Sequence, residues 1–231
     1  MGQLYDITPF TLLDFPGETA CIAWFAGCNL RCVYCHNPDI ALGHGDKEID
    51  ELVAFLKKRA GILTGIVFSG GEATYFPGLG HLAQQAKELG YKVKLDTNGT
   101  RPDVLAYLIR EHLVDYVALD YKCMPDRAEE LIGTSRYTKR FYESLALLIE
   151  ASRKGLGLEI RTTFHADLMD EDELAWIIED LDKHGFKGTY YIQNVVSYGD
   201  KTIGHIPRPE RSINLEKIPK PRNFEIAFRN F

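Results

Sequence analysis

The 231-residue sequence predicts an α/β protein with parallel strands, arranged as an open partial (β/α)6 barrel of the TIM type. Two observations support this class. Short apolar runs rich in β-branched and aromatic residues alternate with segments of helical periodicity. These runs are nearly continuous in hydrophobicity, as expected for parallel strands that are buried on both faces. A full eight-fold barrel needs about 250 residues, so an open six-unit version fits this length better.

Six segments have the composition of buried strands. Each is short, and polar or turn-forming residues separate it from the next helical pattern. The predicted strands are residues 19–25, 65–69, 91–96, 116–120, 158–164 and 189–194.

The segments between these strands carry helical signals. Apolar residues recur at i, i+3, i+4 and i+7, which places them on one face of a helix. Such faces are formed by Ile49, Leu52, Val53 and Leu56, by Phe141, Leu145, Leu148 and Ile149, and by Leu174, Ile177, Ile178 and Leu181. Thr100, Pro102 and Asp103 indicate a helix start, and Gly61, Gly90, Gly155 and Gly185 indicate helix ends.

This alternation stops near Gly199. Two proline pairs, Pro207 with Pro209 and Pro219 with Pro221, favour extended and irregular backbone. We therefore expect residues 1–199 to form one domain and residues 200–231 to form an irregular C-terminal tail packed on it.

Composition excludes several classes of function. The chain has 27 basic and 33 acidic residues, a net charge of −6, so it lacks the basic field that a nucleic-acid partner requires. No apolar stretch approaches the roughly 18 residues of a membrane-spanning helix. The N-terminus has no basic segment ahead of an apolar run, as a signal peptide would have. A cytoplasmic protein with neither nucleic acid nor membrane as partner is expected.

Three of the five cysteines, Cys28, Cys32 and Cys35, lie within eight residues directly after the first predicted strand. Loops after parallel strands are where α/β proteins place their active sites. Thiolates favour zinc or an iron–sulfur cluster, and three of them leave one metal position open. The alternative is a zinc site closed by His36, Cys21 or Cys123. We expect Cys21 and Cys123 to be buried packing residues, since free cysteine is among the most buried types.

The segment Cys28-Asn29-Leu30-Arg31-Cys32-Val33-Tyr34-Cys35 resembles the signature of the radical S-adenosylmethionine (radical SAM) enzymes. Asp14-Phe15-Pro16-Gly17 before it and Cys35-His36-Asn37-Pro38-Asp39 at its end are similar to the activating enzymes of glycyl-radical proteins. Among these, anaerobic ribonucleoside-triphosphate reductase activating proteins are the most similar. Phe15 departs from the pattern, because many activators have glycine there.

This resemblance implies a 4Fe-4S cluster on Cys28, Cys32 and Cys35, with S-adenosyl-L-methionine chelated to the iron that lacks a cysteine. One electron from the reduced cluster would break a carbon–sulfur bond and give a 5′-deoxyadenosyl radical. The implied reaction removes a hydrogen atom from a glycine of a partner, anaerobic ribonucleotide reductase. A low-potential electron donor such as flavodoxin or ferredoxin is the second implied partner.

The sequence Gly70-Gly71-Glu72 follows the second predicted strand. Two glycines allow a close approach of backbone to a ligand, and Glu72 can accept a hydrogen bond from an ammonium group. By itself this sequence is typical of an ordinary turn. Its place one strand after the cysteine loop resembles the motif that binds the methionyl amine in the family, although Ala73 stands where proline is usual.

Further cofactor contacts are predicted at the next strand ends. Asp96 and Asn98 can hydrogen-bond a ribose, or they can form a helix cap and turn. Asp120 and Lys122 alternate along a strand and so share a face. They resemble the pair that holds the amine and carboxylate of the cofactor, with a solvated ion pair as the alternative.

Tyr34 is a further predicted contact of the cofactor, and Arg161, Gln193 and Asn194 are weaker candidates for the same pocket. The resemblance places the ring of Tyr34 beside the cluster and its neighbourhood against adenine, and plain hydrophobic cover is the alternative. Arg161, Gln193 and Asn194 on the last two predicted strands are more often structural polar residues.

Two other functions remain open. A radical SAM enzyme acting on a small molecule, or on another glycyl-radical enzyme, would use the same motifs. An iron–sulfur carrier or a zinc-binding interaction domain would cleave no cofactor. Cys21 and Cys123 are too few for a second 4Fe-4S cluster, which argues against family members with additional cluster domains.

Overall fold

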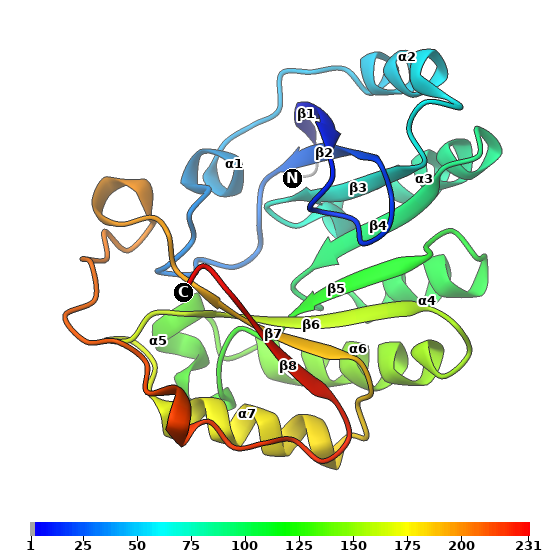
Figure 1. The fold of residues 1–231 in the computed structure, drawn as a ribbon. Coiled ribbons are helices and arrows are strands. Elements are labelled where there is room, and N and C mark those ends of the chain that lie inside the picture. Colours follow the sequence, from blue (N-terminus) through cyan, green and yellow to red (C-terminus); the bar gives the residue numbers. More distant parts are fainter. Residues whose placement is uncertain (1–2) are drawn as a thin grey trace.

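The computed structural model describes residues 3–231, and its strands form one sheet in chain order from β1 to β8. The sheet curves strongly, and helices lie along its outer side (Figure 1). Every neighbouring pair from β2 to β8 is parallel. The predicted α/β class with an open parallel barrel is confirmed. The parallel strands are β2 (Ala20–Ala26), β3 (Gly65–Gly70), β4 (Lys92–Thr97), β5 (Tyr116–Asp120), β6 (Gly157–Phe164), β7 (Thr189–Asn194) and β8 (Glu225–Arg229).

One unpredicted strand, β1 (Gln3–Thr11), precedes the six that the sequence indicates. It pairs antiparallel with β2 at one edge of the sheet. Most of its residues are partly or fully exposed, so it lacks the continuous apolar character by which the other strands are recognised.

The other unpredicted strand, β8, corrects the expectation of a wholly irregular tail. Residues 200–224 contain only two short 3-10 turns, η3 (Gly199–Lys201) and η4 (Leu215–Lys217). The chain then returns to the sheet, where Glu225 N–H donates to Gly188 C=O at 2.9 Å and β8 pairs with β7. Its charged residues hide it in the sequence, and the unpaired backbone of β7 supplies the driving force.

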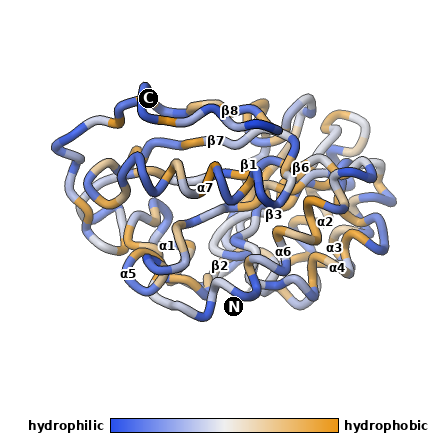
Figure 2. The backbone as a smooth tube through the Cα atoms, turned by 90° about the horizontal axis from the view of Figure 1, so that it is seen from below, coloured by the Kyte–Doolittle hydropathy of each residue, from blue (hydrophilic) through white to orange (hydrophobic). Residues whose placement is uncertain are grey.

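The helices follow the predicted periodicity where they are long. The apolar faces expected on α2, α6 and α7 lie largely against the sheet, and α4 begins at Pro102. Figure 2 shows hydrophobic residues concentrated on α2, α3, α4 and α6. The sequence indicates neither of two five-residue helices, α1 and α5. The helices are α1 (Pro38–Leu42), α2 (Ile49–Arg59), α3 (Leu79–Glu88), α4 (Pro102–Arg110), α5 (Ala128–Ile132), α6 (Tyr137–Ser152) and α7 (Glu171–Lys183), with 3-10 turns η1 (Ala73–Tyr75) and η2 (Pro125–Arg127).

None of the helices in residues 3–231 combines the length and the hydrophobicity needed to cross a membrane.

A small apolar cluster closes the inside of the curved sheet at the amino ends of its strands. Phe15 is 3% exposed, packs on Ile22 and Val67, and lies 5.9 Å from the ring of Tyr116. A Cβ on Gly65 would lie 2.8 Å from the Phe15 ring, so glycine makes room for this plug. The departure at Phe15 therefore has a packing role. The carboxyl ends of the strands stay open above it.

Candidate active site

A cavity of about 260 Å³ lies inside the curved sheet, toward the carboxyl ends of the strands. The structure brings every residue of the predicted cluster and cofactor sites to its wall. Of the weaker candidates, Arg161 and Gln193 also line it, whereas Asn194 does not. The predicted residues on the wall are Cys28, Cys32, Tyr34, Cys35, Gly70, Gly71, Glu72, Asp96, Asn98, Asp120 and Lys122.

The cysteine loop is fixed between the two short helices that the sequence does not reveal. Cys28 N–H donates to Ala41 C=O in α1 at 3.0 Å. On the other side, Arg31 N–H donates to Ile132 C=O and Val33 N–H donates to Leu131 C=O, both at 3.0 Å, at the end of α5. Both helices lie at the same end of the sheet (Figure 1). These bonds give α1 and α5 a clear role, which is to hold the backbone of the cysteine loop.

The three loop cysteines are free thiols that face the cavity. Burial raises the pKa of Cys28 to about 11 and that of Cys32 to about 12. Thiolates at these positions therefore require a strong positive partner, and a metal centre supplies one. Leu30 N–H donates to Cys28 Sγ at 3.4 Å and Asn98 Nδ2 does so at 3.9 Å, so the loop already offers donors to this sulfur.

Of the three residues that could close a zinc site, His36 lines the cavity and the two cysteines do not. Cys21 and Cys123 are buried in the protein core and do not line the cavity, as expected for packing residues. Within the described part of the chain, no three His, Cys, Asp or Glu side chains converge to hold a single metal ion. A 4Fe-4S cluster spreads its ligands over separate iron atoms, and three cysteines leave one iron for another ligand.

Gly70 and Gly71 are required by neighbouring backbone. A Cβ on Gly70 would lie 2.2 Å from Phe25 C=O, and one on Gly71 would lie 2.3 Å from Gly27 C=O. Gly70 also has a φ of +126°, which disfavours other residues. This close approach allows two backbone hydrogen bonds. Gly71 N–H donates to Phe25 C=O at 2.8 Å, and Glu72 N–H donates to Gly27 C=O at 3.0 Å. The glycines thus lock the end of β3 onto the start of the cysteine loop.

The carboxylate of Glu72 lines the cavity and is also bonded within the protein, so its predicted bond from an ammonium group stays a prediction. Its side chain is buried, with Oε1 accepting from Thr97 Oγ1 at 2.8 Å and from Thr74. Oε2 accepts from Asn98 N–H at 2.7 Å. Burial raises the pKa of Glu72 although these hydrogen bonds oppose the rise. The bonds of Glu72 to Thr97 and Asn98 connect the turn after β3 to the end of β4.

Asn98 adopts the turn-forming alternative. Its Oδ1 accepts from Thr100 N–H at 3.0 Å and from Thr100 Oγ1 at 2.6 Å, and its Nδ2 donates to Asn29 Oδ1 at 2.9 Å. Asn98 also lines the cavity, so its contact with a ribose stays a prediction. Of the two predicted ribose contacts, Asp96 and Asn98, Asp96 is the one whose side chain belongs to a group of charged residues on the cavity wall.

Asp120, Arg161 and Lys122 form that wall. Arg161 Nε donates to one oxygen of Asp120 at 2.9 Å and Lys122 Nζ donates to the other at 2.9 Å. Burial raises the pKa of Asp120, but the two cations outweigh burial and lower it to about 2. Burial lowers the pKa of Lys122, but Asp120 outweighs burial and raises it above the usual value. The pair is therefore a largely buried ion pair, not a solvated one.

Arg161 links this pair to Asp96, with NH1 at 3.4 Å from Asp96 Oδ2. Ser69 Oγ donates to the same oxygen at 3.1 Å, and Lys94 Nζ lies 2.9 Å from Oδ1. Burial raises the pKa of Asp96, but Arg161 and Lys94 together lower it below its usual value. Asp96 and Asp120 thus stay ionised around one guanidinium group.

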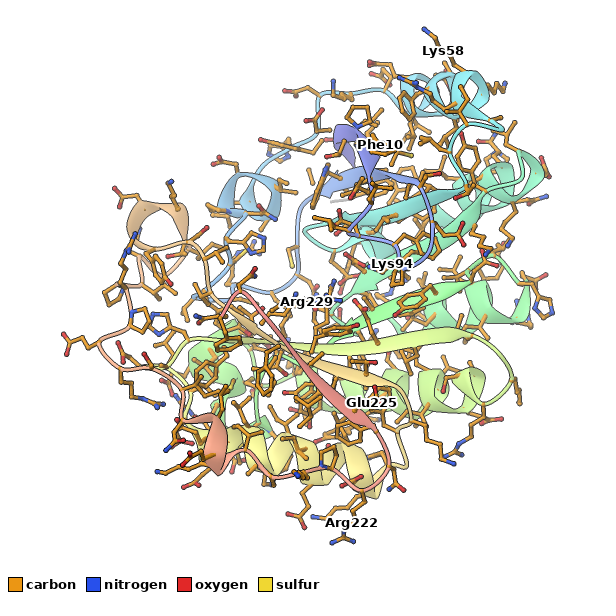
Figure 3. All side chains as sticks on the ribbon, viewed as in Figure 1. Phe10, Lys58, Lys94, Arg222, Glu225 and Arg229 are labelled. Carbon is orange, nitrogen blue, oxygen red and sulfur yellow. The ribbon has the colours of Figure 1, made fainter. Side chains whose placement is uncertain are left out.

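Two buried charges beneath this wall are missing from the prediction. Lys94 and Glu159 are 2% and 1% exposed, and Arg229 of β8 reaches Glu159 at 3.4 Å. Figure 3 shows Lys94 and Arg229 inside the curve of the sheet, whereas Lys58 and Arg222 project outward. The missed signal is spacing: Lys94 precedes Asp96 by two residues and Glu159 precedes Arg161 by two, so each pair shares a face of its strand.

Comparison with known proteins agrees with this geometry. Residues 22–181 match the family model described as "Radical SAM superfamily". The chain belongs to the radical SAM superfamily. It is an enzyme of that superfamily, whose cofactors are a 4Fe-4S cluster and S-adenosyl-L-methionine.

Relatives within the superfamily narrow the family to the glycyl-radical enzyme activating enzymes. The chain is 36% identical over 229 residues to a Methanocaldococcus jannaschii protein named "Putative glycyl-radical enzyme activating enzyme MJ1227", covering 95% of this chain and 87% of that one. It is 31% identical over 194 residues to the pyruvate formate-lyase-activating enzyme of Clostridium pasteurianum, covering 78% of each chain. The radical SAM enzyme described here therefore belongs to the activating type.

A solved structure supports the fold alone. The crystal structure of Streptococcus suis SuiB superposes with a TM-score of 0.66 at 14% identity, over 89% of this chain and 47% of SuiB.

Proposed function

We propose that this activating enzyme removes a hydrogen atom from a glycine of an anaerobic ribonucleoside-triphosphate reductase. The observation that carries the proposal is the meeting of three cysteines with the ionised groups Asp120 and Lys122 at one cavity. The similarity to activating enzymes along most of the chain supports a protein substrate.

In this proposal, Cys28, Cys32 and Cys35 hold the cluster at the edge of the cavity. When bound and reduced, the cluster supplies one electron to S-adenosyl-L-methionine, and the carbon–sulfur bond cleavage that follows provides the radical that takes the hydrogen atom. The loop backbone, anchored by α1 and α5, keeps the three sulfurs on one side of the cavity.

The ion pair at the end of β5 is complementary to the methionyl group of the cofactor. Lys122 stays protonated and can donate to a carboxylate, whereas Asp120 stays ionised and can accept from an ammonium group. Arg161 stabilises Asp120 from the other side at 2.9 Å, so that the carboxylate is fixed before the cofactor arrives.

The remaining residues complete the pocket. Asp96 is the acceptor proposed for the ribose, because its carboxylate faces the cavity and is ionised. The backbone around Gly70 and Gly71 is the surface along which the methionyl group would lie. Tyr34 provides apolar cover beside the cysteines.

A glycine suits the reaction, because its Cα carries two hydrogens and no Cβ blocks the approach of the radical. Two classes of glycyl-radical enzyme are candidates for the partner that supplies this glycine. Relatives of 31% identity named for pyruvate formate-lyase favour a second candidate, in which that class of enzyme is the substrate. A small-molecule substrate is the third possibility, and a carrier without catalysis is disfavoured by the family.

The test compares partners in anaerobic mixtures of the reconstituted enzyme, reductant and S-adenosyl-L-methionine. We expect the electron paramagnetic resonance doublet of a glycyl radical with the ribonucleotide reductase and none with pyruvate formate-lyase. The Cys32→Ala variant, which loses a cluster ligand, is the control and should give no doublet. A doublet with pyruvate formate-lyase alone would replace the partner proposed here. A flavodoxin or ferredoxin as electron donor, and a cytoplasmic location, remain predictions.

A further inference from the structure

Two buried tyrosine hydroxyls hold the backbone of the segment that carries Asp120 and Lys122. Tyr34 Oη donates to Lys122 C=O at 2.9 Å. Tyr137 Oη donates to Asp120 C=O at 3.2 Å and lies 3.5 Å from Lys122 N, from which it can accept. The two hydroxyls thus contact three backbone groups of two residues that have their side chains at the cavity.

The tyrosines come from two different parts of the chain. Tyr34 lies between Cys32 and Cys35 in the cysteine loop, and Tyr137 is the first residue of α6. They are 4% and 3% exposed, and the Tyr137 ring stacks on Phe141 at 4.9 Å between centroids. A tyrosine hydroxyl is protonated at neutral pH, so both hydroxyls can donate to the carbonyls that they contact. Because both rings are packed in the protein interior, the positions of their hydroxyl groups are fixed as well.

The segment starts at the last residue of β5 and runs two residues beyond it, where Thr162 Oγ1 donates to Tyr121 C=O at 2.7 Å. Beyond Asp120 the register with β6 ends, and one further ladder bond follows, from Tyr121 N–H to Arg161 C=O at 2.8 Å. The Tyr121 side chain points away from the cavity and bonds Asp180 at 2.8 Å. Without the two hydroxyls, the carbonyls of Asp120 and Lys122 would lose these partners.

We infer that Tyr34 and Tyr137 are positioning residues, which hold the backbone of Asp120–Lys122 so that the ion pair meets the cofactor beside the cysteine loop. The inference rests on the proposed role of Asp120 and Lys122 in binding S-adenosyl-L-methionine. It also gives Tyr34 a second function, a direct bond from the cluster loop to the cofactor-binding strand end.

The experiment replaces each tyrosine with phenylalanine, which keeps the ring and removes the hydroxyl. Tyr91→Phe is the matched control, because the Tyr91 hydroxyl is also buried and donates to a backbone carbonyl, that of Leu56 at 2.8 Å, outside the cavity. The readouts are the dissociation constant of S-adenosyl-L-methionine for the reconstituted enzyme, the melting temperature, and hydrogen exchange of the Lys122 amide in the protein without cluster.

We expect Tyr34→Phe and Tyr137→Phe each to raise the dissociation constant about 5- to 10-fold, the equivalent of one buried hydrogen bond. Tyr91→Phe should lower the melting temperature by about as much as the other two variants, because it also loses one buried hydrogen bond, while it leaves the dissociation constant within about twofold of the wild type. In Tyr137→Phe the Lys122 amide should exchange faster, because it loses its acceptor.

Unchanged affinity in both Tyr34→Phe and Tyr137→Phe would overturn the inference, as would an equal loss of affinity in Tyr91→Phe. If the wild-type enzyme bound no S-adenosyl-L-methionine, the proposed function would fail. Exchange at Lys122 would still decide whether Tyr137 holds this backbone, since unchanged protection in Tyr137→Phe would contradict it.

Discussion

At the scale of single residues, the cavity wall separates side chains that the protein has already bonded from side chains that still present charge. Glu72 and Asn98 belong to the first group, since protein donors and acceptors surround them. Lys122 and Asp96 belong to the second. Their charges are balanced by neighbours but face the cavity. The two groups should respond differently to substitution.

Glu72→Ala and Lys122→Ala test this distinction. Removal of the Glu72 carboxylate leaves buried donors on Thr74, Thr97 and Asn98 without an acceptor, so we expect the free energy of unfolding to fall by about 1–3 kcal/mol or more. Lys122→Ala should instead weaken S-adenosyl-L-methionine binding at least tenfold, because it removes a charge-assisted donor. Urea unfolding and ligand titration measure the two effects. Weak cofactor binding by a fully stable Glu72→Ala protein would contradict this structural role and support the predicted contact of Glu72 with the cofactor.

The pKa of Asp120 predicts an acid dependence. Burial raises this pKa, but Arg161 and Lys122 lower it from 3.8 to about 2. A carboxyl group with a depressed folded-state pKa contributes stability above its unfolded value, and the contribution disappears as pH falls through the folded value. Between about pH 4 and pH 2 the wild type should therefore lose more stability than Asp120→Asn. Urea unfolding across this range, with equal slopes for both proteins, would show that the ion pair contributes nothing.

At the scale of elements, the site depends on connections between neighbouring strands and loops. The cysteine loop is bonded to α1, to α5 and to the glycine turn after β3, so three elements set its shape. The loop between β1 and β2 lies at the other end of the barrel from the cysteine loop. It closes the amino end of the barrel with Phe15, and Lys94 Nζ donates to Asp14 C=O in the same loop at 2.6 Å.

Phe15→Ala and Leu13→Ala form a matched pair in this loop. Phe15 is 3% exposed and Leu13 is 91% exposed, although they lie two residues apart. We expect Phe15→Ala to lower the free energy of unfolding by about 3–5 kcal/mol through a cavity under Val67 and Tyr116. Leu13→Ala should change it by less than about 0.5 kcal/mol. Chemical denaturation of both variants measures this, and equal stabilities would show that the plug is not part of the core.

At the scale of the whole molecule, the sequence predicts the six central strands because burial on both faces leaves a continuous apolar run in each. The edge strands escape prediction for the opposite reason. β1 is largely exposed, and β8 has charged residues at both ends, so neither has such a run. Pairing with a neighbouring strand, which no local pattern encodes, is what makes them strands.

The candidate site follows the same division. Motif spacing is enough to bring the cysteines, the glycine turn and the Asp120–Lys122 pair to one cavity, because parallel strands end at one edge. Spacing does not reveal which polar groups are already bonded. Glu72 accepts from Asn98 N–H, 26 residues further along the chain, and Asn98 donates to the side chain of Asn29, 69 residues before it. Those partners appear only in three dimensions.

The central claim is that this cavity uses S-adenosyl-L-methionine to take a hydrogen atom from a protein glycine. The most direct measurement supplies the reconstituted, reduced enzyme with S-adenosyl-L-methionine and the anaerobic reductase labelled with α-deuterated glycine, and analyses the 5′-deoxyadenosine by mass spectrometry. Our account predicts 5′-deoxyadenosine that carries deuterium and none of it in the Cys32→Ala control. Product without deuterium, or product undiminished in Cys32→Ala, would contradict the account.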